Sequence, residues 1–302
     1  MQGKNIILLL FSIIILNLSL SAQTGQPSMS FGAYVEKYKP STEEIDVFLH
    51  RDSWVQFDPE VGYILGNFLP HDGMDNSLTI STTEPDGYRT SYMYRGKPCR
   101  INTYGNSFTA GNQVSDGETW QEYLAAHLGE PIRNFGVGGF GVYQSYRRMI
   151  REESTSRGAK YNILYIWGDD HFRSLLRSRY MVTTAWNERQ DEKEGVGTMF
   201  HGNFWSNVEM DLEVGVFREK ENLLPTPESL YKMADSDWMY ENLKDDWALQ
   251  MRLYINKDLD TIDFGKMQRL SELLGTDFFP GQNPRAAVDQ LRTKYSHAAT
   301  KY

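Results

Sequence analysis

The sequence predicts an α/β protein built around a parallel sheet, and three observations support this. Three apolar runs alternate with two helical segments, each run ends in glycine or polar residues, and the last run is nearly unbroken in apolar character. Alternation of this kind implies right-handed crossovers between parallel strands. The polar residues that follow the runs should then gather at one edge of the sheet, where ligands bind in such folds.

The first run begins at Ile101 and delivers a serine, Ser107, directly after its end. Gly105 permits the sharp reversal that a side chain would obstruct. A hydroxyl beyond the carboxyl end of a parallel strand is well placed for chemistry. The other interpretation is that Ser107 caps the next helix, and these few residues do not decide between the two.

The two helical segments and the remaining strands follow in order. Asp116 to Gly129 is predicted to be an N-capped helix with Trp120, Tyr123, Leu124 and Leu128 on one face. Pro131–Val137 is the second strand, and Val142–Gly158 is a helix with Tyr143, Tyr146, Met149 and Ile150 inward. Tyr161–Trp167 is expected to be a strand covered on both faces, because its apolar character does not alternate.

The ends of the three runs resemble the conserved blocks of the SGNH, or GDSL-like, hydrolase superfamily, and in particular its secreted bacterial members. The matching stretches are Gly105-Asn-Ser-Phe-Thr109, Asn134-Phe-Gly-Val-Gly-Gly139 and Gly168-Asp-Asp-His171, and the resemblance covers roughly Cys99–Ser174. It implies a flavodoxin-like, three-layer α/β/α fold. Asn106 replaces the aspartate that usually precedes the serine.

The resemblance also implies roles for individual residues. Ser107 would be the nucleophile, and the backbone N–H of Gly139 would help to bind the oxyanion. Asp170 stands where the family has an asparagine whose amide donates to the oxyanion, whereas an ionised carboxylate only accepts hydrogen bonds. Either Asp170 is protonated, or another group donates, or catalysis is weakened. His171 could supply a donor or pair with Asp170.

The general base is not evident in the sequence. The family has an Asp-x-x-His pair late in the chain, and none follows Ser174. The only histidines there are His201, in an aromatic loop, and His297, in a segment over Asn283–Tyr302 with helical spacing. His201 is the better auxiliary candidate. We therefore expect either a C-terminally truncated form of a longer protein or a chain that has lost its triad and kept a binding cleft.

The first residues predict export. Met1–Ala22 has a positive start at Lys4, an apolar stretch and a small-residue exit, as a signal peptide does. A membrane anchor is the alternative, but the apolar run is shorter than the roughly 20 residues that a spanning helix needs. The mature protein is expected to be secreted or periplasmic. Cys99 is the only cysteine, so no internal disulfide forms, and we expect it to be a small buried residue.

Composition limits the classes of partner. The net charge is −9, and no basic cluster of the kind that binds nucleic acid is present. The arginines of Arg147-Arg148 and Arg173–Arg179 are expected on solvated or ion-paired faces. The histidine spacing does not resemble a zinc site, and no cofactor is expected. The sequence does not define an oligomeric state.

The chain divides into three parts. After the signal peptide, residues 30–97 are rich in turns and aromatic residues, and we expect an accessory arm of short strands or extended segments. Residues 98–302 form the α/β domain, with a helical insertion at about 190–275 that could cap the cleft. Within it, Gln190–Asn222 is expected to be a loop and Pro225–Leu274 helical.

The leading functional hypothesis is an exported serine hydrolase that cleaves an ester through an acyl-Ser107 intermediate, with a carbohydrate O-acyl ester as candidate substrate. The second hypothesis is a catalytically impaired protein of the same fold that binds glycans or a surface. A relative of the glycan O-acetyltransferases is the third.

Overall fold

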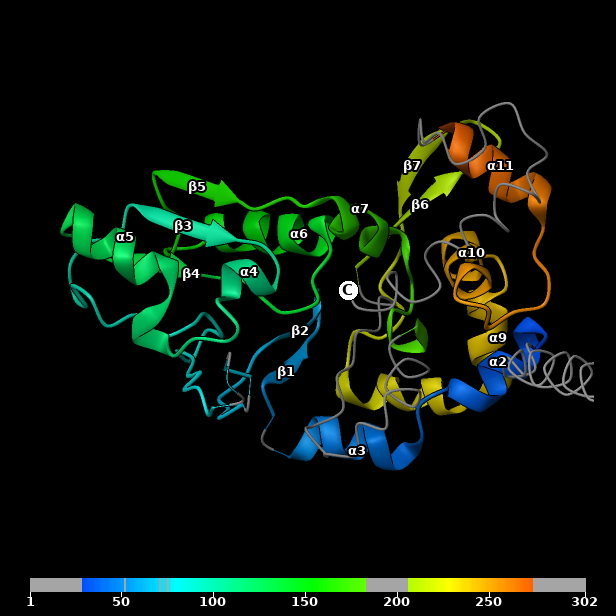
Figure 1. The fold of residues 1–302 in the computed structure, drawn as a ribbon, viewed down its shortest axis with the longest axis horizontal. Helices are drawn as coiled ribbons and strands as arrows, with labels where there is room; N and C mark the ends of the chain where they lie inside the picture. Colours follow the sequence, from blue (N-terminus) through cyan, green and yellow to red (C-terminus); the bar gives the residue numbers. More distant parts are fainter. Residues whose placement is uncertain are drawn as a thin grey trace, which may run out of the picture.

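The protein is an α/β protein with a three-stranded parallel sheet, as the sequence predicts. The computed structural model describes residues 29–182, except positions 52, 71, 74 and 76, and residues 206–273. Strands β3 (Ile101–Tyr104), β4 (Ile132–Asn134) and β5 (Tyr161–Leu164) pair in the order β4-β3-β5, all in parallel (Figure 1). All three strands therefore end at the same edge of the sheet.

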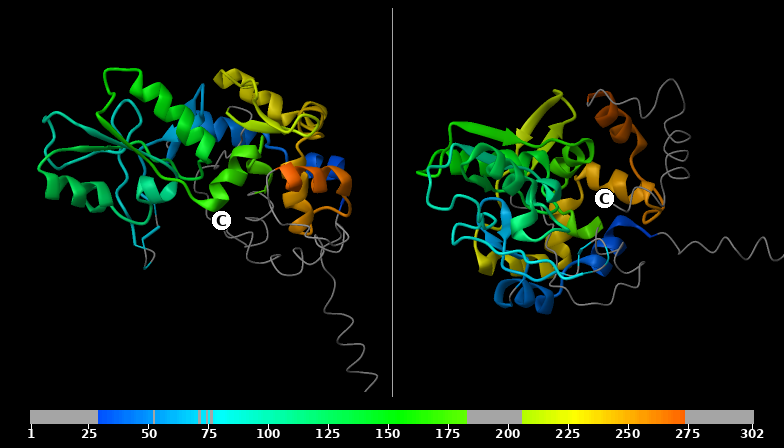
Figure 2. Two further views of the ribbon diagram at one scale, coloured as in Figure 1. Left: turned by 90° about the horizontal axis from the view of Figure 1, so that it is seen from above. Right: turned by 60° about the vertical axis from the view of Figure 1, so that its left-hand side comes forward.

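Helices cover both faces of this sheet. Helix α4 (Ser107–Ala110), the 3-10 turn η2 (Asp116–Glu118) and α5 (Trp120–Leu128) follow β3, and α6 (Val142–Glu153) joins β4 to β5. Helices α4 and α5 lie on one face and α6 on the other (Figures 1 and 2). This is the arrangement that crossover connections between parallel strands produce.

Helix α5 buries a different face from the one expected. It begins at Trp120, after the separate turn η2, and it buries the polar residues Gln121 and Glu122. Gln121 donates to the hydroxyl of Thr103 in β3, and the carboxylate of Glu122 accepts two backbone N–H bonds from the arm. Three of the four residues on the predicted apolar face, Trp120, Tyr123 and Leu128, stay exposed, and Tyr123 has 71% of its surface in solvent. Specific hydrogen bonds therefore override the apolar pattern here.

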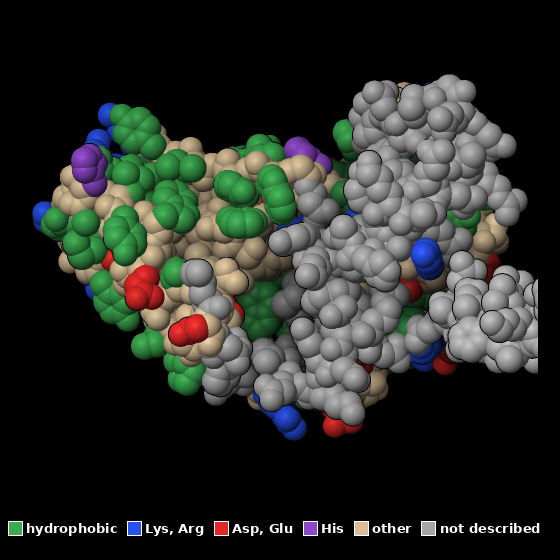
Figure 3. Space-filling model, in the orientation of Figure 1, with side chains coloured by type: hydrophobic (Ala, Val, Ile, Leu, Met, Phe, Trp, Pro, Cys, Tyr) green, Lys and Arg blue, Asp and Glu red, His purple; other side chains and the backbone are tan. Residues whose placement is uncertain are grey.

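Helix α6 and strand β5 also expose apolar residues that were expected to be buried. In α6 the buried residues include Gln144, Arg148 and Glu152, whereas Tyr146 and Ile150 are exposed. Strand β5 was expected to be covered on both faces, but it is the last strand in the sheet order and three of its four residues are exposed. Exposed apolar side chains gather over this part of the molecule (Figure 3).

The first part of the arm is helical, not extended as the sequence suggested. Helices α2 (Phe31–Tyr38) and α3 (Thr42–His50) begin after serine caps, and Ser41 forms a capping box with Glu44. An antiparallel hairpin of β1 (Val55–Asp58) and β2 (Gly62–Leu65) follows. The expectation of short strands thus holds only for this later part of the arm.

The chain after residue 205 forms a hairpin and then helices. Strands β6 (Val208–Asp211) and β7 (Val216–Glu219) lie within the stretch expected to be a loop. The helical pattern after Pro225 is confirmed by η3 (Pro227–Ala234), α9 (Ser236–Leu243), α10 (Trp247–Ile255) and α11 (Phe264–Leu273). These helices pack against α2 and α3 around a common apolar core that contains Tyr34, Ile45, Leu230, Leu243 and Leu249 (Figure 1).

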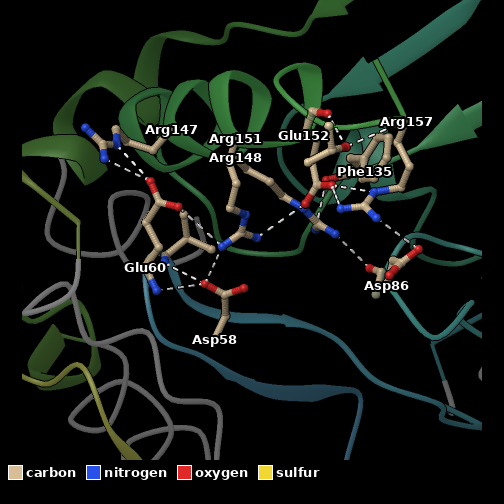
Figure 4. Close-up of polar contacts among 12 residues, drawn as sticks. Asp58, Glu60, Asp86, Phe135, Arg147, Arg148, Arg151, Glu152 and Arg157 are labelled. Carbon is tan, nitrogen blue, oxygen red and sulfur yellow. Dashed lines mark hydrogen bonds and ion pairs between the residues drawn. The ribbon is translucent and has the colours of Figure 1, made fainter. Parts of the chain in front are cut away.

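An arginine-rich network ties the arm to the outer face of α6 (Figure 4). Arg151 pairs with Asp58 at 2.9 Å, and Arg147 pairs with Glu60 at 2.9 Å. Burial alone would raise the pKa of Asp58, but the hydrogen bond and charge of Arg151 bring it below its usual value. Part of the expectation for Arg147-Arg148 is therefore confirmed, because Arg147 is ion-paired.

Arg148 corrects the other part of that expectation, because its side chain is fully buried. Its guanidinium donates to the carbonyl oxygens of Phe135 and Gly87, and it lies over the ring of Phe135. Burial lowers the pKa of Arg148 to about 10, mainly through loss of solvation. Arg148 thus joins the arm, α6 and the end of β4.

Asp246 at the start of α10 makes stability depend on pH. Burial raises its pKa to about 6 from 3.8, against the lowering effect of N–H bonds from Leu249 and Arg177. A raised carboxyl pKa means that the folded state binds the proton more tightly, so this group contributes stability below pH 4 that is lost as pH rises through 6. We expect Asp246 to favour folding by about 2 kcal/mol more at pH 4.5 than at pH 7.5.

Denaturant unfolding at these two pH values measures this contribution when wild type is compared with Asp246→Asn. The asparagine side chain keeps an oxygen acceptor but does not titrate. The difference in unfolding free energy between the two proteins should therefore change with pH, and a constant difference would contradict the assignment.

Candidate functional site

The loops that follow β3, β4 and β5 meet at one edge of the sheet, and Ser107 lies there as the first residue of α4. The Asn106 side chain caps this helix by accepting the N–H of Phe108 at 2.9 Å. Ser107 is half-buried, and its hydroxyl forms no hydrogen bond within the described part of the chain. The serine is therefore not used as the helix cap, because Asn106 takes that role.

Gly105 is required for this turn. Its φ is +156°, a value that side-chain-bearing residues rarely adopt. A Cβ atom here would lie 2.2 Å from Oγ1 of Thr109 and 2.9 Å from Cβ of Tyr165. The glycine thus lets the chain turn tightly from β3 into α4.

The loop after β4 lies against α4. The N–H of Val137 donates to the carbonyl of Gly105 at 3.0 Å, and the Asn134 side chain donates to the carbonyl of Ala110 at 3.1 Å. A Cβ atom on Gly136 would lie 2.3 Å from the backbone nitrogen of Ala110, so this contact needs glycine. The loop reaches α7 (Gly168–Leu175) at its other end, where Gly141 approaches Ser174.

Gly139 lies in this loop with a φ of +80°, and its carbonyl accepts a bond from Arg179 at 2.7 Å. Across residues 29–182 and 206–273, the backbone N–H groups of Ser107 and Gly139 have no hydrogen-bond partner. Unpaired N–H groups at a helix start and in a glycine loop are suited to binding an anionic oxygen.

Asp170 is buried in α7 and contacts the serine loop. Its Oδ2 accepts a hydrogen bond from the Asn106 amide at 2.7 Å, and its Oδ1 pairs with Arg173 at 2.9 Å. A neighbouring guanidinium favours the charged form of a carboxylate. Of the three alternatives for Asp170, the geometry therefore disfavours the protonated donor, because the Asn106 amide and the Arg173 guanidinium both approach it as an acceptor.

The described histidines form no hydrogen bond with Ser107. His171 follows Asp170 and is exposed on α7, and His50 is exposed on α3. His127 lies at the end of α5, next to the start of β4, and so belongs to the opposite edge of the sheet. His201 and His297, the two candidates late in the chain, lie outside the described residues.

Arg89 is a supporting residue whose role the sequence did not reveal. It is buried, pairs with Asp116 at 2.7 Å, and donates to the carbonyls of Ala110 and Gly111 at the end of α4. The Arg89 guanidinium also donates to the carbonyl of Val114. In the sequence it belongs to the short stretch Asp86-Gly87-Tyr88-Arg89, which precedes the first strand. Arg89 thus holds the end of the helix that carries Ser107.

Comparison with protein-family models, curated proteins and solved structures finds no match to this chain. Among the described residues, no group of three or more His, Cys, Asp or Glu side chains is arranged to hold a metal ion. None of the helices that the structure describes has the length and apolarity to cross a membrane. Cys99 is a half-buried free thiol that donates to the carbonyl of Ile101.

Proposed function

We propose that this protein is a serine hydrolase of the SGNH, or GDSL-like, type that cleaves ester bonds, with the flavodoxin-like fold of that superfamily. The observation that carries the proposal is that the Ser107 hydroxyl and the backbone N–H groups of Ser107 and Gly139 have no hydrogen-bond partner within the described residues, in the loops that follow β3 and β4 at the edge where the parallel strands end. A nucleophile beside oxyanion donors is the minimum arrangement for acyl transfer.

In this mechanism the Ser107 oxygen attacks the ester carbonyl, and the two N–H groups stabilise the negative oxygen of the tetrahedral intermediate. The serine proton passes through a general base to the departing alcohol, which leaves an acyl-serine. Water then attacks the acyl-serine and restores Ser107. The candidate for the base is His201, which lies outside the described residues, because His171 lines a cavity to which Ser107 does not contribute.

Asp170 has a positioning role in this proposal. Its carboxylate binds the Asn106 amide, and Asn106 caps the helix that begins with Ser107. Because both oxygens of Asp170 already have partners, the oxyanion is left to the backbone donors. The family has an aspartate before the serine and an asparagine in the third block. This chain has Asn106 and Asp170 at these positions, so the two residue types are exchanged.

The proposed substrates are carbohydrate O-acyl esters or other small esters, and the proposed location is outside the cytoplasm. Export rests on Met1–Ala22 alone. Expression of the full chain with a C-terminal tag tests it, because removal of the leader would give a mature N-terminus after Ala22. An uncleaved N-terminus would contradict export by this route.

Ser107→Ala tests the catalytic assignment. We expect this variant to hydrolyse a short-chain nitrophenyl ester at least about 100-fold more slowly than the mature wild type, because the variant lacks the hydroxyl that forms the acyl intermediate. A fluorophosphonate probe should label wild type and not the variant. Equal turnover in both proteins would rule out Ser107 as the nucleophile.

A second candidate function is a non-catalytic glycan-binding protein of the same fold. The Asp170–Arg173 ion pair favours it, because a charged carboxylate occupies the position where the family has an amide donor. Glycan-array binding that survives Ser107→Ala, together with absence of ester turnover in wild type, would support this candidate over the hydrolase.

A further inference from the structure

A large apolar cavity, whose lining does not include Ser107, lies between α6, α7 and the β6–β7 hairpin. Its volume is about 730 Å³, which is within the range of roughly 300–1,000 Å³ for small-molecule sites. Aromatic side chains of Tyr146, Phe172 and Phe217 line it, and the buried side chains of Met251 and Leu270 contribute from α10 and α11. Seven strands and helices thus contribute to one hydrophobic space, because β5 and β7 supply Leu164 and Phe217 beside the residues of α6, α7, β6, α10 and α11.

Two polar groups of the wall, the hydroxyls of Ser174 and Tyr143, are already used in hydrogen bonds. The hydroxyl of Ser174 donates to the carbonyl of Asp170 at 2.9 Å and accepts the N–H of Tyr143 at 3.0 Å. The Tyr143 hydroxyl is bonded to Glu219, and burial together with this bond raises its pKa to about 12. A ligand in the cavity would find few free hydrogen-bonding groups.

Charge further restricts the occupant. Among the described residues that line the cavity, none is Lys, Arg, Asp or Glu, and His171 is the single histidine. An ionic ligand would lose hydration without gaining a partner. A peptide segment would bury backbone N–H and C=O groups that need partners which the described wall does not supply. An uncharged, flexible hydrocarbon loses no hydration of a charge and buries no unpaired backbone group.

We propose that this cavity is a binding site for a neutral aliphatic molecule of the size of a medium-chain fatty alcohol. The site is separate from Ser107 and does not depend on the proposed hydrolase activity. Helix α7 contributes to both sites, because Asp170 contacts Asn106 while His171, Phe172 and Leu175 line the cavity.

Displacement of a fluorescent probe tests the proposal on the mature full chain. Phenylnaphthylamine, a neutral probe that brightens in apolar surroundings, should bind, and dodecanol should displace it more effectively than dodecanoate at neutral pH. Val208→Phe in β6 places a ring in the cavity and should weaken probe binding at least about tenfold, since the added ring occupies the space that the probe needs. Ser107→Ala should bind the probe as wild type does.

Val216→Phe is the matched control, because Val216 lies on the same hairpin, is exposed and does not line the cavity. Gly168→Leu is a second cavity-filling variant, since nothing lies within 4 Å of a Cβ atom there. Thermal unfolding confirms that each variant is folded. The proposal is wrong if folded cavity-filling variants bind the probe as wild type does, if dodecanol does not displace it, or if Tyr123→Ser on the exposed face of α5 abolishes binding instead.

Discussion

Replacing Arg89 with methionine is expected to lower the free energy of unfolding by about 3–5 kcal/mol, the usual cost of breaking a buried ion pair from one side. The substitution leaves the carboxylate of Asp116, which is 1% exposed, without its cation. It also removes the donors to the carbonyls of Ala110, Gly111 and Val114. Methionine restores the bulk of the side chain but none of these bonds.

Urea denaturation of wild type and variant measures this loss. Arg95→Met is the matched control, because Arg95 pairs with Glu84 at the surface and 62% of its side chain is exposed. Surface pairs contribute about 0–1 kcal/mol, so the control should change stability little. A similar loss in both variants would show that the buried network does not carry the stability assigned to it.

The sequence predicted the parallel sheet because apolar runs and glycine turns are local signals. The three strands, their order of connection and the turn at Gly105 all follow from residues within a few positions of one another. The N-terminal helices were not predicted, although Ser30 and Ser41 are ordinary helix caps, because both helices are short and the rest of the arm is rich in turn residues.

The buried faces of α5 and α6 could not be predicted from apolar periodicity. Their inward residues are polar, and they have partners far away in the sequence, as Arg148 does in Gly87 and Glu122 in Met93. Apolar periodicity alone places such polar residues on the solvent-facing side of a helix. Only the position of the arm, which lies on the sheet domain, reveals why they are buried.

In the candidate site, too, local features were predicted and contacts between distant residues were not. Ser107 and its glycine turn were found because the motif is continuous in the chain. The bond between Asn106 and Asp170 joins positions 64 residues apart, and the sequence left the charge of Asp170 open for that reason. The support from Arg89 likewise depends on carbonyl groups, which carry no side-chain signal.

Gly136→Ala should damage both stability and the proposed activity. An added Cβ would lie 2.3 Å from the nitrogen of Ala110 and 2.6 Å from the carbonyl carbon of Thr109, closer than real Cβ contacts. Both atoms are backbone, so the strain cannot be relieved by rotating a side chain. We expect a loss of about 3 kcal/mol in unfolding free energy, the upper end of typical overpacking costs.

The same clash is expected to move α4 and therefore Ser107, because Ala110 and Ser107 are the two ends of one short helix. A displacement of about 1 Å at a reacting group lowers catalytic rates by about 100-fold. Hydrolysis by the folded fraction should fall accordingly, measured at a temperature where circular dichroism shows the variant to be folded. Gly117→Ala is the control, because nothing lies within 4 Å of a Cβ atom there. Full activity and stability in Gly136→Ala would mean that the β4 loop does not hold α4 in place, and the oxyanion role proposed for Gly139 would lose its structural basis.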